Sequence, residues 1–146
     1  MYCQLYIRNG IAYVPITAKT EAGYYMNVDP VEVVPVSDTE SFARAVDRVI
    51  AHGHPIVPTP TRASGFPKPV VPKYAKLGSW RAFEKGATSW KLVEKDGVYT
   101  IEQWQKREQG GWLPDPDRDE QLPQGASLDD AVRRLVERIQ ESVGNQ

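Results

Sequence analysis

The stretch that decides the fold is residues 89–105, which read SWKLVEKDGVYTIEQWQ. Side-chain chemistry alternates along Ser89–Lys95 and again along Val98–Gln105, and a period of two residues is the mark of a β-strand with two different faces. Asp96-Gly97 stands between the two runs and is typical of the type I′ turn that joins antiparallel strands. The stretch therefore predicts a β-hairpin.

A second hairpin is predicted at the N-terminus. Tyr2–Arg8 alternates, Asn9-Gly10 is a strong two-residue turn signal, and Ile11–Ile16 is apolar and rich in β-branched residues. An extended stretch follows over residues 24–36. Two prolines interrupt it, and because proline cannot donate a hydrogen bond to a central ladder, we expect this stretch to be broken or to lie at an edge of the sheet.

The first helix is predicted near residues 38–52. Ser37 and Glu40 have the spacing of a capping box, with Ser37 as the N-cap, and Gly53 and Pro55 end the helix. Apolar residues at helical spacing form one face: Phe42, Ala45, Val46, Val49 and Ile50.

The second long helix is predicted near residues 128–142. Ser127 is its N-cap, with Asp130 at the third helical position, where the helix dipole favours a negative charge. Its apolar face contains Leu128, Ala131, Val132, Leu135, Val136, Ile139 and Val143.

The segment between the hairpins is rich in proline. Residues 55–72 hold six of the twelve prolines, which exclude a regular helix there and leave room for a short strand around Ile56-Val57. A helical turn is expected at Ser79–Lys85. The order of elements predicts an α+β fold, a mainly antiparallel sheet with two hairpins covered by two helices, in a single domain of residues 1–146.

Composition narrows the class of protein. The 146 residues are 40% hydrophobic and 25% charged, as in ordinary globular proteins. No apolar run approaches the ~20 residues that cross a bilayer, and the N-terminus has no basic region followed by an apolar one. The only cysteine, Cys3, cannot form an internal disulfide or a multi-cysteine metal site. We therefore expect a cytoplasmic protein that does not interact with membranes.

The sequence offers little for catalysis. His52 and His54 flank the end of the first predicted helix, and two ligands are too few for a metal site. His52 lies in the last turn of this helix, where the helix dipole favours a cation. Cys3 lies among apolar neighbours in a predicted strand, as buried cysteines do. No glycine-rich phosphate loop or Gly-x-Ser-x-Gly elbow occurs. We expect no enzyme, cofactor, metal or small-molecule substrate, with an enzyme that uses these three residues as the remaining alternative.

Charge is unevenly distributed although the net charge is only −1. Residues 62–91 carry seven Lys/Arg against Glu84 alone, with aromatic residues between them. This basic stretch supports an alternative function as a small nucleic-acid- or anion-binding module. The near-neutral net charge argues against nucleic acid.

An acidic, turn-rich loop follows the second hairpin. Glycines before it and prolines within it predict an exposed and partly pre-organised loop, which lowers the entropic cost of binding. Its carboxylates would orient a basic partner, and a tryptophan would supply an apolar anchor, although core packing is the commoner role of tryptophan. The predicted partner-binding residues are Trp112, Asp115, Asp117, Asp119 and Glu120.

The second half also resembles a known family. The pattern consists of Ser79-Trp80-Arg81-Ala82-Phe83, Ala87, Trp90, Asp96-Gly97-Val98-Tyr99, Gly111-Trp112, Leu122-Pro123 and Ser127-Leu128-Asp129. Over residues 77–143 it resembles the immunity proteins of bacterial contact-dependent growth-inhibition systems. These are structural residues without a catalytic signature. The resemblance implies a cytoplasmic antitoxin that binds and blocks the C-terminal toxin domain, often a nuclease, of its own system.

Overall fold

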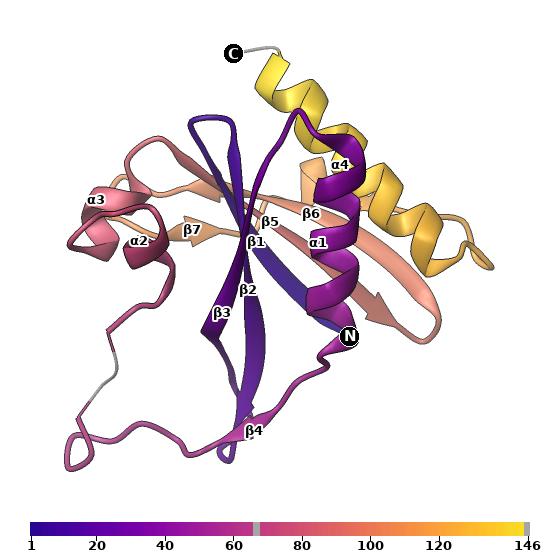
Figure 1. Ribbon diagram of the computed structural model, residues 1–146. Coiled ribbons are helices and arrows are strands. Elements are labelled where there is room, and N and C mark those ends of the chain that lie inside the picture. The colour runs from indigo at the N-terminus through magenta and orange to yellow at the C-terminus, as the bar shows by residue number, and fades with distance from the viewer. Residues whose placement is uncertain (66–67, 145–146) are drawn as a thin grey trace.

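The computed structural model describes residues 1–65 and 68–144, and its centre is an eight-stranded sheet with the order β3-β2-β1-β5-β6-β7 (Figure 1). Short strands β4 and β8 pair with β2 and β6. The strands are β1 Tyr2–Arg8, β2 Ile11–Thr20, β3 Tyr25–Pro35, β4 Ile56–Val57, β5 Ala87–Lys95, β6 Val98–Lys106, β7 Trp112–Leu113 and β8 Glu120–Gln121. The helices are α1 Thr39–Ala51, α2 Val71–Tyr74, α3 Trp80–Glu84, the 3₁₀ turn η1 Pro116–Arg118 and α4 Leu128–Gly144.

Both predicted hairpins are confirmed. β1 pairs with β2 and β5 with β6, each antiparallel. Asn9 and Gly10 have φ of 52° and 73°, and Asp96 and Gly97 have φ of 53° and 78°. Positive φ at both central residues is what a type I′ turn requires, so the two dipeptides fix the registers of the two hairpins.

The prediction for residues 24–36 is also confirmed, since β3 lies at the edge of the sheet. Its pairing with β2 jumps from Pro15 opposite Val31 to Ile16 opposite Val28. Asp29 and Pro30 fall in this irregularity and have no partner in the ladder, which a proline tolerates at an edge.

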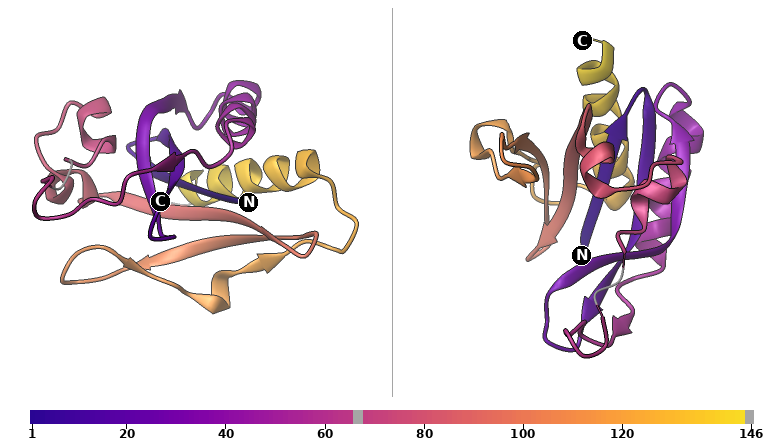
Figure 2. Two further views of the ribbon diagram at one scale, coloured as in Figure 1. Left: turned by 90° about the horizontal axis from the view of Figure 1, so that it is seen from below. Right: turned by 90° about the vertical axis from the view of Figure 1, so that its left-hand side faces the viewer.

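The long helices α1 and α4 cover one face of the sheet, and Figure 2 shows them on the same side of the β5–β6 hairpin. The core between helices and sheet contains the fully buried Phe42, Trp90 and Leu135. All five residues of the predicted apolar face of α1 are buried or packed against this core, and so is the predicted face of α4.

The two helices start differently from one another. At α4 the predicted N-cap Ser127 is confirmed, because Asp130 N–H donates to Ser127 Oγ at 3.0 Å, and Ser127 N–H donates in turn to the Asp130 carboxylate at 3.1 Å. At α1 the predicted N-cap Ser37 is wrong. Asp38 caps the helix by accepting Ser41 N–H at 3.1 Å, because the turn that leaves β3 still includes Ser37.

A smaller layer covers the opposite face of the sheet at one end. Under α2 and α3, Tyr6 and Tyr13 from the sheet pack against Val71 and Phe83. The helical turn expected at residues 79–85 is α3, capped by Ser79. The exclusion of helix from residues 55–72 is corrected at its end, because α2 begins at Val71. Its proline lies in the first turn, where the missing N–H has no helical partner to lose. None of the helices in the described residues is long and apolar enough to cross a membrane.

Candidate interaction surface

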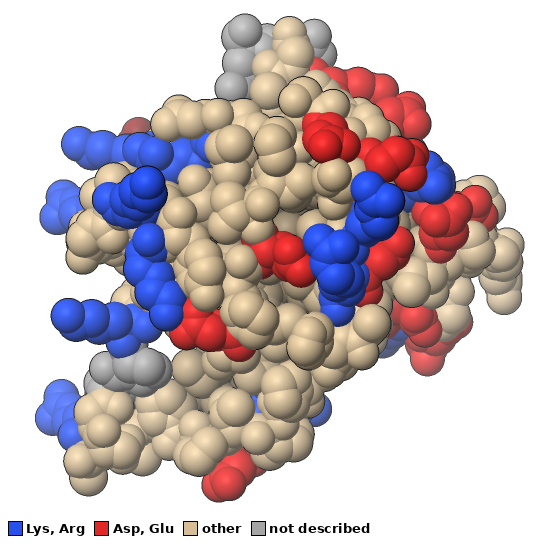
Figure 3. Space-filling view, viewed as in Figure 1, with Lys and Arg blue, Asp and Glu red and all other residues tan. Residues whose placement is uncertain are grey.

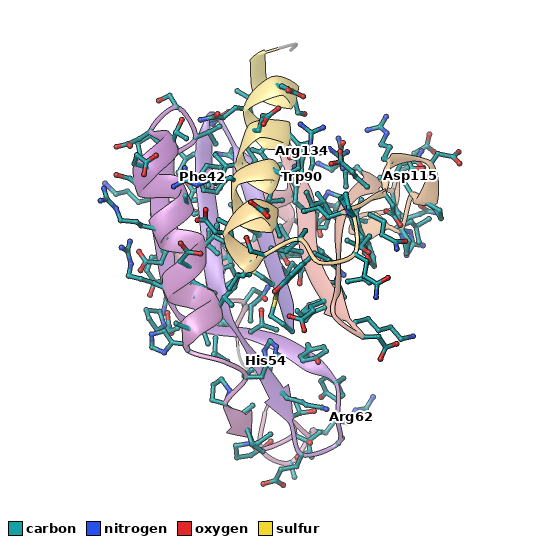
Figure 4. The ribbon with its side chains drawn as sticks, turned by 90° about the vertical axis from the view of Figure 1, so that its right-hand side faces the viewer. Phe42, His54, Arg62, Trp90, Asp115 and Arg134 are labelled. Carbon is teal, nitrogen blue, oxygen red and sulfur yellow. The ribbon has the colours of Figure 1, made fainter. Side chains whose placement is uncertain are left out.

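The five predicted partner-binding residues lie together at one edge of the sheet, on residues 112–121, here called the acidic segment. Its two ends, β7 and β8, both pair with β6. Trp112 of β7 lies opposite Lys106, and Glu120 of β8 lies opposite Ile101. The turn η1 connects these strands. In Figure 4, Asp115 lies at the outer end of this segment, and Arg134 lies on the side of α4 that faces it.

Trp112 attaches the acidic segment to the smaller core. Its ring centroid lies 5.5 Å from that of Tyr6 and 5.8 Å from that of Trp80. Its indole N–H is buried and has no acceptor within the described part of the chain. The residue is half-buried, so Trp112 is first a packing residue, and only its remaining surface is open to a partner.

The carboxylates of the acidic segment differ in how far they are neutralised. Asp115 pairs with Arg118 at 3.2 Å, three residues further on. Asp117 and Asp119 are exposed and form no ion pair with a described residue. Desolvation, reinforced by Glu102 and Asp115, raises the pKa of Asp119. Two of the four carboxylates therefore present uncompensated charge.

Glu120 is the most strongly paired of them. Arg134 of α4 donates to both of its carboxylate oxygens, at 2.7 and 2.9 Å, and holds the pKa of Glu120 below its usual range. Arg134 also pairs with Glu137 at 2.8 Å. Arg134 was not predicted as a site residue, because its place on the polar face of α4 gives no indication that β8 lies against it.

Arg138 lies one turn further along α4 and links the same segment to the main core. It donates to the backbone carbonyl of Arg118 at 2.9 Å, and its guanidinium lies 5.4 Å from the ring centroid of Trp90. The acidic segment is thus fixed to α4 by charge-assisted hydrogen bonds at two points, and this makes it a pre-organised surface.

A groove of about 500 Å³ runs between the acidic segment and the end of the β5–β6 hairpin. Two tryptophans, Trp104 and Trp112, line it together with Gln103, Gln105 and Arg118. Apolar rings next to hydrogen-bonding amides and two cations, Arg118 and Lys106, are a composition that suits a protruding side chain of a protein partner. The groove joins the anchor residue to the charged rim.

The three residues considered for catalysis have structural roles. Burial raises the pKa of the Cys3 thiol to about 12, so it is not a thiolate at neutral pH. His54 lies where β1 and β2 separate: its Nδ1 is 2.7 Å from Thr17 O, and its Nε2 accepts Tyr2 N–H at 3.2 Å. The imidazole therefore joins two strands that no longer pair directly. His52 forms the C-cap of α1.

Cys3 and His54 line one small cavity of about 180 Å³, and His52 is not among the residues that line it. Within the described ranges, no group of three or more His, Cys, Asp or Glu side chains could hold a metal ion.

Three of the seven cations in the basic stretch of residues 62–91 have different surroundings. Lys73 pairs with Asp29 at 2.8 Å. Lys91 is only 7% exposed, with its ammonium 3.4 Å from the ring centroid of Trp104 and 5.0 Å from that of Tyr2. Arg62 lies on the loop beyond β4, far from the acidic segment (Figure 4). Phe66, one of the aromatic residues in this stretch, lies outside the described residues.

No protein-family model and no curated protein matches the sequence. Two solved structures are similar to the chain along nearly its whole length. The protein of unknown function NMB0488 from Neisseria meningitidis has a TM-score of 0.64 at 12% identity, over 93% of this chain and 90% of that one. A chain of the CdiA-CT/CdiI toxin and immunity complex from Yersinia pseudotuberculosis has a TM-score of 0.59 at 12% identity, over 94% of this chain and 95% of that one. At such identity the likeness shows a shared fold.

Proposed function

We propose that this chain is a cytoplasmic immunity protein that binds and neutralises the C-terminal toxin domain, a nuclease, of its own contact-dependent inhibition system. The observation that carries the proposal is the shared fold with a chain of a toxin and immunity complex, over 94% of this chain. The family resemblance of residues 77–143 was drawn from the sequence alone and supports the same conclusion independently.

The chemistry of the side chains supports binding over catalysis. Cys3 is buried with a raised pKa, and both nitrogens of His54 are engaged by the backbone of the sheet. Neither residue is available as a nucleophile or general base, because a nucleophile must reach its substrate and a base needs a free nitrogen. The exposed chemistry of the described chain is instead charged and aromatic, as in a protein interface.

We place the interface on the acidic segment, at Trp112, Asp115, Asp117, Asp119 and Glu120. A nuclease holds phosphates with positive charge, and a carboxylate rim complements such a surface. Within this rim Asp117 and Asp119 contribute most of the attraction, since Asp115 and Glu120 are already paired. Trp112 and Trp104 form the apolar part of the contact through the groove between them.

The alternative function, a nucleic-acid- or anion-binding module built on residues 62–91, has less support. Three of its seven cations are separated from one another, in an ion pair, a buried site and a distant loop, and only Arg81 and Lys85 line a common groove. Nucleic-acid binding needs cations that follow a phosphate backbone along one surface. Salt-sensitive binding of RNA by the isolated protein would restore this alternative.

The test is co-purification of this chain with the C-terminal domain of the protein encoded immediately upstream. We expect a stoichiometric complex and loss of the toxicity of that domain. Reversal of Asp115, Asp117 and Asp119 to lysine should slow association by about tenfold, and more at low salt, because rim charges steer encounter. Reversal of Glu21 and Asp47 to lysine, two exposed acids outside the segment, is the control. An unchanged association rate after the triple reversal would show that the interface lies elsewhere.

A further inference from the structure

A second charged surface lies on the other side of Lys106. Two cations are Arg81 in α3 and Lys85, the residue after α3; the other two are Lys106, the last residue of β6, and Arg107, which follows it. They line a groove of about 570 Å³, here called the basic groove, together with Trp80, Glu84, Glu108, Gln109 and Gly110. Figure 3 shows Lys and Arg gathered along the left edge of the molecule, the side where Figure 1 places α2 and α3.

The four cations of the basic groove are exposed and form no ion pair with a described residue. Of the two acids that line the groove, Glu108 is exposed next to Arg107, whereas Glu84 turns inward and is 8% exposed. The Glu84 carboxylate accepts Gly111 N–H at 3.1 Å, so it is committed to the backbone of the turn between β6 and β7. The groove therefore presents four cations against one exposed carboxylate and is positive on balance.

The walls of the basic groove are held in place by hydrogen bonds. Lys106 Nζ donates to the backbone carbonyl of Glu84 and so ties β6 to α3. Arg8 of β1 donates through Nε to the carbonyl of Lys85 at 3.2 Å. In the turn between β6 and β7, Gly110 has φ of +105°, and a Cβ there would approach the Glu84 carboxylate to 3.3 Å. A groove fixed in this way binds without first ordering its walls.

We infer that the basic groove binds an acidic segment of the protein partner. The inference rests on the proposed function in taking that partner to be the toxin domain. A carboxylate-rich segment matches the groove in charge, and arginine can receive carboxylates in bidentate fashion. With the carboxylates of the acidic segment beyond Lys106, the partner is contacted by one negative and one positive surface. That arrangement fixes the orientation of binding as well as its strength.

The features of the groove favour an acidic protein segment over nucleic acid. Nucleic acid without fixed sequence is held by open aromatic rings between cations. Trp80 supplies the ring in this groove, and that ring already packs against three others. Its centroid lies 5.3 Å from the ring centroid of Tyr6, 5.5 Å from that of Phe83 and 5.8 Å from that of Trp112. The cations are also confined to one short groove on a chain of net charge −1, too few to follow a long phosphate backbone.

The test compares two variants with the same change in charge. The groove variant combines Arg81→Glu, Lys85→Glu and Arg107→Glu, and leaves Lys106 in place because it holds the Glu84 carbonyl. The control variant combines Arg44→Glu, Arg62→Glu and Lys95→Glu, three exposed cations outside the groove. Circular dichroism establishes that both are folded. Binding to the upstream-encoded toxin domain is then measured by calorimetry at two salt concentrations.

We expect the groove variant to bind the toxin domain at least tenfold more weakly than the wild type, and the control to stay within threefold. Equal binding by the two variants would overturn the inference while leaving the proposed function in place. If the wild type itself does not bind the toxin domain, the proposed function fails, and a fluorescent deca-glutamate peptide then tests the groove alone. There we expect the same tenfold loss in the groove variant. No difference from the control, or tighter binding of a single-stranded twelve-nucleotide RNA that the groove variant loses, would overturn the inference.

Discussion

The acidic segment and the basic groove lie on opposite sides of the end of β6, and each is rich in charge, yet their charges are arranged differently. In the acidic segment, Asp115 and Glu120 are compensated by arginines of η1 and α4. In the basic groove, Arg81 and Lys85 form no ion pair with a described residue, and of the two acids in the lining Glu84 is buried while Glu108 is exposed. The charge that a partner meets therefore differs from the charge that the sequence lists.

This difference separates charges that support the fold from charges that are free to bind. Paired carboxylates such as Glu120 have already lost part of their hydration to an intramolecular partner, so they contribute little to binding. Exposed and unpaired groups keep their full charge for an encounter. We therefore expect substitutions of the paired groups to affect mainly stability, and substitutions of the unpaired groups to affect mainly binding.

Trp112→Ala should have the largest effect on stability. The substitution removes a ring packed against Tyr6 and Trp80 at the junction of the two regions, and we expect it to lower the free energy of unfolding by about 2–4 kcal/mol. Leu113→Ala, at the neighbouring and half-exposed position, should cost less than about 0.5 kcal/mol. Urea unfolding monitored by circular dichroism compares the two. Similar losses would show that Trp112 is not a packing residue.

Lys91 sharpens the comparison, since it is a cation of the basic stretch that is buried. Desolvation lowers its pKa from 10.5 to about 8, with Glu102 acting in the opposite direction. Between these values the unfolded chain binds more protons than the folded one, so stability rises as pH increases through 8 toward 10.5. The wild type should gain on the order of 1–2 kcal/mol over Lys91→Met between pH 8 and pH 10. Parallel pH profiles for the two proteins would contradict this burial.

The Glu120–Arg134 pair predicts a smaller effect of pH on the other side. Because Arg134 lowers the pKa of Glu120, the stabilisation is complete above the ordinary pKa of a glutamate and is lost as pH falls through the lowered value. Both side chains are about one-third exposed, so solvent screening limits the loss in Glu120→Gln to about 0.5–1 kcal/mol at pH 7.

Asp117→Asn provides the matched control for the pair, because Asp117 is exposed and forms no ion pair with a described residue. Its substitution should leave stability unchanged within about 0.3 kcal/mol. Chemical unfolding at pH 7 and pH 3 makes the comparison, and the difference between the two variants should be smaller at pH 3 than at pH 7. A cost for Asp117→Asn equal to that for Glu120→Gln would contradict the division into paired and free carboxylates.

Charge reversal in the basic groove should also have little effect on stability. The combination of Arg81→Glu, Lys85→Glu and Arg107→Glu removes no ion pair seen in the described residues, so we expect a change within about 0.5 kcal/mol. Thermal unfolding at low salt is the measurement. A loss above about 2 kcal/mol would mean that these cations support the fold.

The sequence predicted the parts of the fold that local chemistry determines. Asn9-Gly10 and Asp96-Gly97 set the hairpins because few residues adopt positive φ, and Ser127 with Asp130 set the start of α4. At α1 two adjacent residues could both cap the helix, and the choice of Asp38 over Ser37 depended on where the turn after β3 ends. The helical turn α3 was predicted at residues 79–85, but α2 and the position of both helices on the second face were not, because short helices carry little periodic signal.

The candidate site was only partly accessible from the sequence. The acidic segment is contiguous, and its exposure followed from its glycines and prolines. The basic groove joins residues 81–85 to residues 106–107 across 20 positions, and only the pairing of β5 with β6 brings them together. The pairing of Glu120 with Arg134 likewise depends on the packing of α4 beside β8. Such contacts between distant residues require the fold.

The central claim is that this chain neutralises a toxin by binding it, and titration of the toxin domain tests it most directly. The C-terminal domain encoded upstream is assayed for nuclease activity while the purified chain is added in increasing amounts. We predict that activity falls linearly to zero at one equivalent of this chain, while the Asp115→Lys, Asp117→Lys and Asp119→Lys triple variant requires an excess at low toxin concentration. Undiminished nuclease activity in the presence of a large excess of the folded wild-type chain would contradict the account.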